Sequence, residues 1–503
     1  MTAKLAGRYG ARFTRFAAVI FIATLPAVAQ APGDSKAESA SKVERKNRAP
    51  VSKEILHVTL PKPVEMTLPN GMTVLILEDH RFPTVALDFT IQGAGALWEP
   101  ADAHGMASVA AQMLREGTAT RTSKQINEEI DRLGASFYAS APYGDGATSV
   151  GAYGLSDNLD AWLPVVADLL LNPSYPADEL TKLKQRLKVQ LLQQRQQPGF
   201  LASERFSKAV YGSHPAATIS ATPESIDSLT PEKLAQWHKE RYAPQNTILG
   251  VAGDVNAAEF VAKLKTWFAK WQKSGASVPA TPQTSAAKER RVFVVDRPAS
   301  VQTTLAIGNI AIERTSPDYP AMVVMDQILG AGAAGRLFLN LREAKGYTYG
   351  VYSSFAARKY AGPFRAGGDA RTEVTAGAMT EFWNEFGRIR DEKVPAGELD
   401  DARRAVVAAF ALSLEHPDQV LDFAVERKIY GLPADYWDKY PAQVAAVTAE
   451  DVQRVAQKYV DPQTMQIVAV GDAQKIVPVL EKYGHVQLFD LQDKPEELKP
   501  PGK

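Results

Sequence analysis

The sequence predicts an α+β protein that contains two tandem homologous domains. Residues 230–254 recur as residues 448–472, and the Pro-Gln and Gly-Asp pairs inside the two copies keep the same offset of 218 positions. Each copy opens with a threonine and an acid two residues later, continues as a helix, turns at Pro-Gln and ends in an apolar strand. This period is too long for a solenoid, so it indicates duplicated domains of about 220 residues.

Mixed strand and helix patterns in each half support this fold class. In the first half we expect strands at 72–77 and 84–91, followed by helices at 104–114, 123–133, 159–171 and 177–194. The second half repeats the order, with strands at 291–295 and 302–307, helices at 319–329 and 335–344, and a strand at 350–355. Because these strands and helices do not alternate strictly, the order favours α+β over a parallel α/β sheet.

Composition excludes several classes of protein and of site. The chain has 503 residues, long enough for a sizeable core, and its 57 basic and 57 acidic residues leave no net charge. Without a surplus of positive charge, we expect no nucleic-acid partner. The absence of cysteine excludes disulfides, thiolate metal ligands and a catalytic thiol, so a metal would need histidines and carboxylates.

The N-terminus has the order of a secretory signal. Residues 1–15 carry four basic side chains and no acid, an apolar run starts at Phe16, and small residues follow before Ala31. We therefore expect a signal peptide at 1–29 and a flexible leader at 30–50. No later stretch reaches the length of a membrane span, which predicts a protein secreted across the inner membrane, in the periplasm.

The repeat and the composition place the domain boundaries. We expect a first domain at 51–271, a Pro/Ser/Ala-rich linker at 272–289, a second domain at 290–488 and a C-terminal tail at 489–503.

Three stretches, 68–80, 104–118 and 339–350, resemble the insulinase (pitrilysin) family of zinc metallopeptidases, and the similarity extends from about Val51 to Leu488. The resemblance implies tandem homologous α+β domains that face each other across a chamber. It also implies a relationship to the noncatalytic subunit of mitochondrial processing peptidase and of bacterial two-chain relatives.

The zinc motif of the resembled family is degenerate in this chain. Active members carry H-x-x-E-H, in which two histidines one helical turn apart bind zinc and the glutamate activates water. The corresponding positions here are Ser108, Ala111 and Gln112, and the family's third ligand aligns with Gln190. Hydroxyl and amide groups do not hold zinc against water. The seven histidines form no i, i+3 or i, i+4 pair. We therefore expect no metal in this chain, and zinc in a partner subunit.

The second half retains residues that the family uses on the substrate. An arginine and a tyrosine seven residues apart contact the substrate carbonyl or the oxyanion, and Arg342 and Tyr349 match them. An alternative is that Arg342 pairs with Glu343 on the surface and that the tyrosines are ordinary strand aromatics. Tyr347 is a weaker candidate for the tyrosine role.

A glycine-rich segment follows the helix predicted at 319–329. Gly330, Gly332 and Gly335 match G-x-G-x-x-G, but the preceding helix and the phenylalanine at position 355 argue against a dinucleotide site. The resemblance implies a substrate-binding loop instead, to which Tyr347 would also contribute. Residues 135–139 occupy the strand that active subunits pair with substrate, but they lack the usual Asn-Ala pair.

Two hypotheses for function follow. In the first, the chain is the zinc-less subunit of a two-chain metallopeptidase, which closes the chamber on peptide substrates and lends Arg342 and Tyr349 to a zinc-bearing insulinase-family partner in a heterodimer. In the second, it is a scaffold that binds peptides or proteins without hydrolysis. An independent peptidase is the weakest reading, because no Ser/His/Asp set or carboxylate pair stands out.

Overall fold

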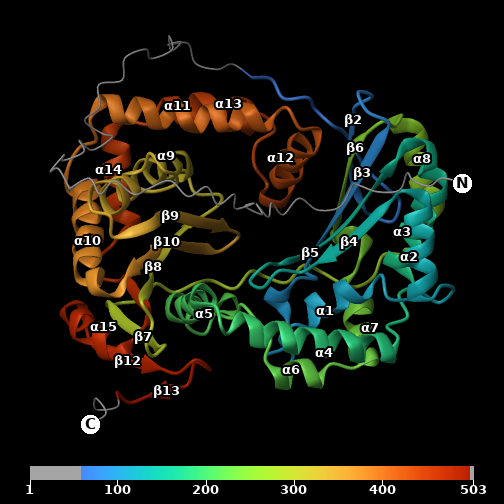
Figure 1. Ribbon diagram of the computed structural model, residues 1–503. Coiled ribbons are helices and arrows are strands. Elements are labelled where there is room, and N and C mark those ends of the chain that lie inside the picture. Colours follow the sequence, from blue (N-terminus) through green and yellow to red (C-terminus); the bar gives the residue numbers. More distant parts are fainter. Residues whose placement is uncertain (1–57, 499–503) are drawn as a thin grey trace, which may run out of the picture. The chain divides into compact units, whose positions relative to one another are not determined.

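Two mixed β-sheets, each built from one half of the sequence, organise the computed structural model, which describes residues 58–498 (Figure 1). The first sheet contains β1 (Val64–Thr67), β2 (Thr73–Glu78), β3 (Thr84–Gln92), β4 (Ser136–Ser140), β5 (Ala147–Leu155) and β6 (Thr247–Gly253). The second contains β7 (Arg291–Asp296), β8 (Gln302–Glu313), β9 (Thr348–Arg358), β10 (Ala361–Arg371), β11 (Gln466–Gly471), β12 (Val486–Phe489) and β13 (Pro495–Glu496).

The strand pairings of the two sheets follow one pattern. The parallel pair β2–β6 corresponds to the parallel pair β7–β11. Strand β3 runs antiparallel to β5 and β6, as β8 does to β10 and β11. Strand β4 pairs antiparallel with β5, and β9 with β10. The duplication that the sequence predicted is therefore confirmed at the level of topology.

Helices surround both sheets. Those of the first half are α1 (Met106–Met113), α2 (Ser123–Leu133), α3 (Leu159–Leu171), α4 (Ala177–Gln194), α5 (Pro198–Tyr211), α6 (Pro223–Ser228), α7 (Pro231–Arg241) and α8 (Ala257–Trp267). Those of the second are α9 (Tyr319–Leu329), α10 (Thr375–Asp391), α11 (Ala396–Ser413), α12 (Pro417–Tyr430), α13 (Tyr436–Ala445), α14 (Ala449–Tyr459) and α15 (Ala473–Leu480).

Local signals explain several helix bounds. Helices α2, α3, α4 and α9 have the predicted limits. The Thr230 side chain accepts the backbone N–H of Lys233, and the Thr448 side chain accepts that of Asp451, so the repeated threonines are N-caps. The helix predicted at 335–344 is instead a π-helix over Phe338–Ala344. Its geometry continues at the C-terminal end, where the Lys345 N–H donates to the carbonyl of Asn340, five residues back.

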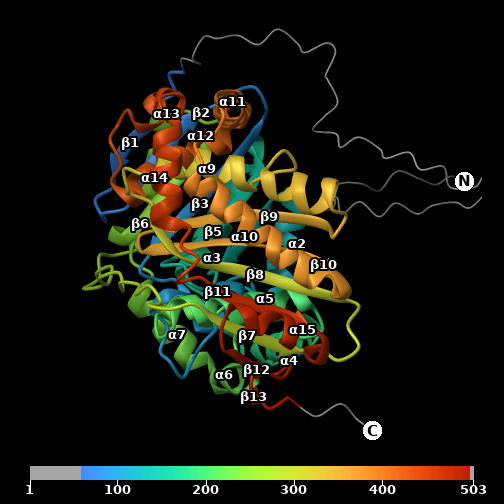
Figure 2. The same cartoon turned by 90° about the vertical axis from the view of Figure 1, so that its left-hand side faces the viewer.

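Alternate residues of the central strands enter different cores. Val74 and Ile76 of β2 pack with the helices of the first half, whereas Leu75 and Leu77 lie in the core that contains the second half. In the second sheet, Leu305 and Ile307 face the same core as α9 and α10, while Ala306 faces the opposite way. Both sheets are therefore buried on two faces. Figure 2 shows α10 and α14 on one face of the second sheet.

One helix from each half packs on the sheet of the other half. Helix α5 lies against β8 and β11, and Leu201, Phe206 and Val210 bury their side chains with Phe293 and Val468. Helix α12 lies against β2 and β6. The two helices occupy corresponding positions, since each begins with proline at its first turn and ends at a glycine. The halves are thus joined by a reciprocal exchange of helices.

Close approach explains a glycine in β6. A Cβ atom at Gly250 would lie 2.9 Å from Cδ2 of Leu421 and 3.3 Å from Cγ2 of Val425, both on α12. The missing side chain therefore lets α12 settle on the first sheet. On the same helix, Arg427 and Lys428 form ion pairs with Glu65 of β1.

Segments outside the predicted domains also contribute to the fold. The linker 272–289 contains no helix or strand, and the Thr284 hydroxyl donates to the Ala361 carbonyl. The predicted tail includes β13, and Asp493 forms ion pairs with Arg205 and Lys208 of α5.

The predicted signal peptide and leader lie outside the described residues. Among residues 58–498, no helix combines the length and apolarity needed to cross a membrane.

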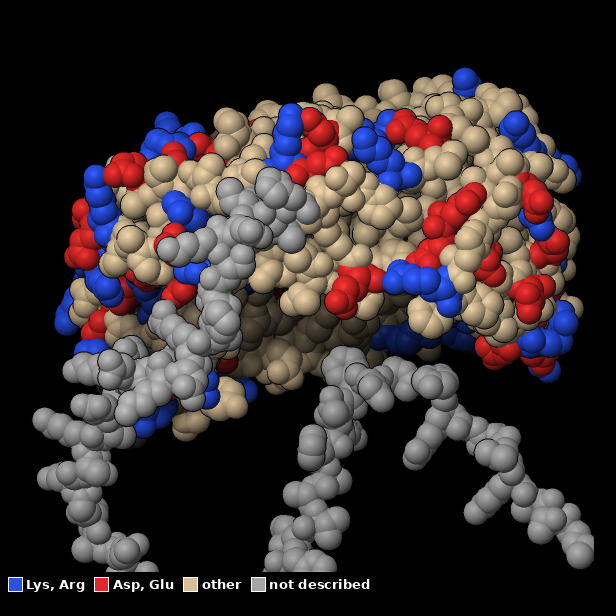
Figure 3. All heavy atoms as spheres, turned by 90° about the horizontal axis from the view of Figure 1, so that it is seen from above, with Lys and Arg blue, Asp and Glu red and all other residues tan. Residues whose placement is uncertain are grey.

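Charge is mixed on the surface that Figure 3 presents. Lysine and arginine side chains alternate with aspartate and glutamate on this face, without a large field of one sign. The view agrees with the balanced charge of the sequence.

A pair of acidic residues lies where α12 meets the first sheet. Asp88 of β3 is in register with Gly151 and Gly250, and its Oδ1 atom is buried without a hydrogen-bond partner among the described residues. Burial and the nearby Asp422 of α12 raise the pKa of Asp88 to about 6. Burial, Asp418 and Glu426 raise the pKa of Asp422 to about 6. The contact is therefore more favourable when these carboxyl groups are protonated.

Asp88→Asn should stabilise the protein at neutral pH. Because the folded-state pKa of Asp88 lies above its unfolded value, the stability that the neutral carboxyl gives is complete below about pH 4 and is lost as pH rises through about 6. The gain in free energy of unfolding of the variant over the wild type should be larger by about 2 kcal/mol at pH 7.5 than at pH 4.5. Urea denaturation at the two pH values measures this difference.

Asp102→Asn is the matched control, because Asp102 is exposed and the substitution removes the same charge. A stability difference for Asp88→Asn that does not change between pH 4.5 and 7.5 would contradict the account of this contact.

Candidate functional site

Three of the four positions that the resemblance assigns to the degenerate zinc motif line one small cavity. Ser108 and Gln112 of α1 and Gln190 of α4 line a space of about 230 Å³. The Gln112 amide donates a hydrogen bond to the Ser108 hydroxyl over 3.1 Å. The structure thus brings Gln190 together with two residues that precede it by about 80 positions.

Helix geometry sets two of these side chains side by side. Helix α1 starts after Gly105, whose φ of 98° favours glycine, and residues four apart lie one turn apart on the same face. Ala111, at the position of the family's glutamate, is 1% exposed and packs in the hydrophobic core of the first half. Helix α1 therefore has the helical geometry that the family's motif requires, but it carries a hydroxyl, a methyl and an amide group at the three motif positions.

The donor set of this cavity does not fit zinc. Zinc in proteins takes imidazole, thiolate or carboxylate ligands, whereas Ser108, Gln112 and Gln190 offer a hydroxyl and two neutral amides. Within residues 58–498, no group of three or more histidine, cysteine, aspartate or glutamate side chains is arranged to hold a metal ion. No chemistry that depends on zinc can be assigned to these residues.

A carboxylate and an imidazole, those of Glu99 and His104, lie close to the start of α1. Glu99 accepts the backbone N–H groups of Gly105 and Ala107, so it satisfies free donors at the start of α1. Burial raises the pKa of Glu99 to about 7. Nδ1 of His104 lies 4.0 Å from the Glu99 carboxylate, and burial lowers the pKa of His104. Glu99 therefore belongs to the framework of the helix.

Other polar residues of the cavity were missed from the sequence. Gln194 lies one turn after Gln190 on α4 and also lines the space, so helical spacing could have identified it. Tyr143 and Ser220 come from loops far away in the sequence, and no local pattern marks them.

The structure brings Arg342 and Tyr349 together. Arg342 lies on the π-helix, and its guanidinium carbon is 4.7 Å from the ring centre of Phe338 and 5.2 Å from that of Tyr349. Nη1 of Arg342 also lies 3.6 Å from Oε1 of Glu343, which is the ion pair that the alternative interpretation expects. The Tyr349 side chain, on β9, is 87% exposed. Both groups are therefore open to a molecule that approaches β9.

Tyr347 lies differently from Tyr349. A Cβ atom at Gly377 of α10 would be 2.8 Å from the Tyr347 ring, so this ring packs against α10 and is partly buried. Because the Tyr347 ring is partly buried, a ligand has less access to it than to Tyr349.

The three glycines after α9 have unequal surroundings. A Cβ at Gly330 would lie 2.7 Å from the Ser353 nitrogen, and one at Gly335 would lie 2.7 Å from the Gly330 Cα, so both positions need glycine for close packing. Nothing lies within 4 Å of a Cβ at Gly332. The loop is therefore packed at its two ends and open at Gly332.

Each sheet presents a strand edge. Strand β4 pairs only with β5 among the described strands, and its Tyr138 is half exposed, with its ring covering Gly151. Strand β9 pairs with β10 along its length and touches β8 only at Ala357 and Arg358. Free strand edges with exposed tyrosines can accept an extended peptide.

Comparison with known proteins identifies similar chains. Residues 73–224 match the family model of the insulinase (peptidase family M16) domain, and residues 228–406 match that of the peptidase M16 inactive domain. The uncharacterized zinc protease YmxG of Bacillus subtilis is 24% identical over 69% of this chain and 84% of its own length. An uncharacterized zinc protease of Rickettsia felis is 29% identical over 64% of this chain and 79% of its own.

Solved structures share the architecture. A peptidase M16 inactive domain from Pseudomonas fluorescens superimposes with a TM-score of 0.75 at 28% identity, covering 81% of this chain and 98% of its own. A protease from Helicobacter pylori has the same TM-score at 20% identity and covers 82% of this chain and 100% of its own. Because the two halves match M16 family models and the solved M16 structure shares the architecture, the chain belongs to the insulinase family of peptidases.

Proposed function

We propose that this protein is the zinc-less subunit of a two-chain metallopeptidase, in which a separate family member carries the zinc. The observation that supports this proposal is the contrast between two places in the chain. The cavity around Ser108 and Gln112 is lined only by neutral groups, whereas Arg342 and Tyr349 are in contact, with Tyr349 exposed and Arg342 half exposed.

The chemistry of this pair suits peptide hydrolysis. Attack on a peptide carbonyl develops negative charge on oxygen, and a guanidinium and a phenol can both donate hydrogen bonds to it. Stacking on Phe338 and Tyr349 restrains the Arg342 side chain before substrate arrives, which lowers the entropy that is lost on binding. The partner would supply the water activated by zinc, and this chain would supply hydrogen bonds to the oxyanion.

The strand edges suggest how a peptide is held. Backbone pairing to an edge strand captures an extended peptide with little regard to its sequence, while side-chain pockets give selectivity. Strand β9 carries Tyr349 and Tyr352 with exposed rings and is the edge nearest to Arg342 in sequence. The signal at 1–29 would place this activity in the periplasm.

A second candidate function is a scaffold that binds peptides without hydrolysis. The amide-lined cavity favours it, because Gln112, Gln190 and Gln194 can donate to and accept from a peptide backbone without a metal. The two functions differ in whether Arg342 affects turnover.

Arg342→Ala should lower kcat of the reconstituted two-chain enzyme. Removing one donor to an oxyanion costs about 100- to 1,000-fold in kcat in well-studied cases, and an exposed donor should lie at or below that range, about 10- to 100-fold. Zinc content should not change, because the residue is not a ligand. Steady-state hydrolysis of a fluorogenic peptide, with metal analysis of the same samples, measures both quantities.

Arg371→Ala is the control, since Arg371 is also an exposed arginine of the second half that pairs with a neighbouring glutamate. An Arg342→Ala enzyme with wild-type kcat would remove the oxyanion role and favour the scaffold.

Restoring three ligands should restore metal binding to this chain. The variant Ser108→His, Gln112→His, Gln190→Glu places two imidazoles one turn apart opposite a carboxylate, in the same cavity. We expect zinc after dialysis to rise from a trace to about one ion per chain, as three protein ligands suffice for a catalytic-type site.

The variant that lacks only Gln190→Glu should retain much less zinc. If the folded triple variant binds none, as judged by elemental analysis together with circular dichroism, the side chains at 108, 112 and 190 do not converge as described.

A further inference from the structure

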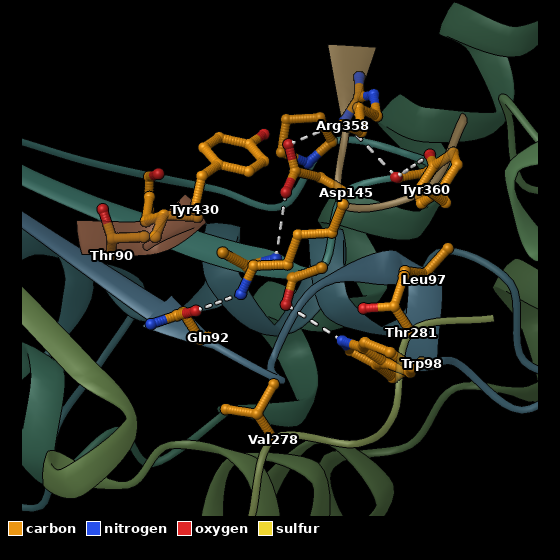
Figure 4. Close-up of a pocket in the computed structure, with 17 residues that line it drawn as sticks. Thr90, Gln92, Leu97, Trp98, Asp145, Val278, Thr281, Arg358, Tyr360 and Tyr430 are labelled. Carbon is orange, nitrogen blue, oxygen red and sulfur yellow. Dashed lines mark hydrogen bonds and ion pairs between the residues drawn. The ribbon is translucent and has the colours of Figure 1, made fainter. Parts of the chain in front are cut away.

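A second cavity lies between the two halves, away from the degenerate metal positions. It has a volume of about 240 Å³, and its walls come from the first sheet, the loop before β5, the linker, the β9–β10 turn and the end of α12 (Figure 4). None of its lining residues also lines the cavity around Ser108. At about 30 Å³ per water molecule, it has room for a ligand roughly the size of one amino acid.

The walls combine apolar surface with an unbalanced charge. Leu97, Trp98 and Ile429 contribute apolar and aromatic surface. The charged side chains that line the cavity are Asp145, Arg358 and Lys359. Arg358 donates to the Asp145 carboxylate over 3.1 Å, so these two charges neutralise one another.

Lys359 is the third charged residue of the lining, and it lies outside the Arg358–Asp145 ion pair. Lys359 is an exposed residue, and its ammonium donates to the Gln92 side-chain carbonyl over 2.7 Å. No ion pair joins Lys359 to another residue within 58–498. Partial burial lowers the pKa of Lys359, and the nearby Asp145 carboxylate, which is already paired with Arg358, opposes this shift in part. An anionic ligand in the cavity would supply the missing charge.

Hydroxyl groups in the same cavity also have unused hydrogen-bonding capacity. Thr90 is only 8% exposed and lines the space, and no described residue bonds to its hydroxyl. The same holds, within residues 58–498, for the hydroxyls of Ser149 and Tyr430. Figure 4 shows Thr90 and Tyr430 near one another on one side, with Gln92 and Arg358 on others. These groups could hold the second oxygen of a carboxylate or a polar atom beside it.

We propose that this cavity binds a small monocarboxylate with an apolar or aromatic body. The carboxylate would bond to Lys359, while Trp98, Leu97 and Ile429 cover the apolar part. One uncompensated positive charge fits one negative charge, which favours a carboxylate over a doubly charged phosphate. The source is either a free small molecule or the C-terminal residue of a peptide.

A ligand bound in this cavity would contact both halves of the chain. Lys359 and Tyr430 belong to the second half, whereas Thr90, Trp98 and Ser149 belong to the first. The same region already holds a direct bond between halves, from the Tyr360 hydroxyl to the Gly144 carbonyl over 2.5 Å. A ligand that contacts both sides should therefore stabilise the folded chain.

Isothermal titration of the full mature chain with N-acetylphenylalanine at pH 7 tests the proposal. We expect saturable binding and a rise in Tm, at least tenfold weaker binding to Lys359→Met, and recovery in Lys359→Arg. Lys270→Met, which removes an exposed charge elsewhere, should bind as the wild type does. N-acetylphenylalaninamide, the neutral analogue, should bind at least tenfold more weakly to the wild type.

A hexapeptide that ends in phenylalanine distinguishes the two sources. Equal affinity for the peptide and for N-acetylphenylalanine identifies a peptide C-terminus as the ligand, whereas binding of the small acid alone identifies a free carboxylate. No binding of the acid at 10 mM, or equal binding to wild type and Lys359→Met, would overturn the proposal. Peptidase activity is not part of this test, so the proposal can fail while the proposed function stands.

Discussion

Each sheet of this protein has two apolar faces, and its own half supplies helices for one of them. The second face is covered by a helix of the other half: α5 packs on β8 and β11, and α12 packs on β2 and β6. Without the exchange, Leu75 and Leu77 on one sheet and Ala306 and Val468 on the other would lose the partners that bury them. The hydrophobic effect therefore fixes the two halves as one body, and it also positions the cavity next to Lys359, which takes its walls from both.

The packing that joins the two halves does not depend on the polar side chains of the candidate sites. The frame of α1 and α4 depends on buried residues such as Val109, Met113 and Leu183, and not on the groups at 108, 112 and 190. Substitution at 108, 112 and 190 therefore does not remove core packing, and the cavity that these residues line has neutral walls. Arg342 and Tyr349, in contrast, stabilise little by themselves because one is exposed and the other half exposed. Their exposure leaves both side chains accessible to a ligand or a partner.

Much of the fold could be predicted from local sequence. The internal repeat predicted the two tandem domains. The threonines at 230 and 448 predicted helix starts, which the structure confirms. The exchange of α5 and α12 could not be predicted, because it depends on contacts such as Leu421 with Gly250, about 170 positions apart. At the site, Ser108 and Gln112 were found through the resemblance to the family's zinc motif, whereas the approach of Tyr143 depends on tertiary packing. The π-helix that carries Arg342 has no local signal that distinguishes it from an α-helix.

The most direct measurement determines the zinc content and the rate of peptide hydrolysis, first for this chain alone. The same two quantities are then measured while the chain is titrated into a family member from the same organism that has an intact H-x-x-E-H motif. The account predicts that the chain alone contains no stoichiometric zinc and is inactive, and that turnover of the partner rises with added chain until the two are equimolar. A partner that is equally active without this chain would contradict the account, as would stoichiometric zinc in the wild-type chain.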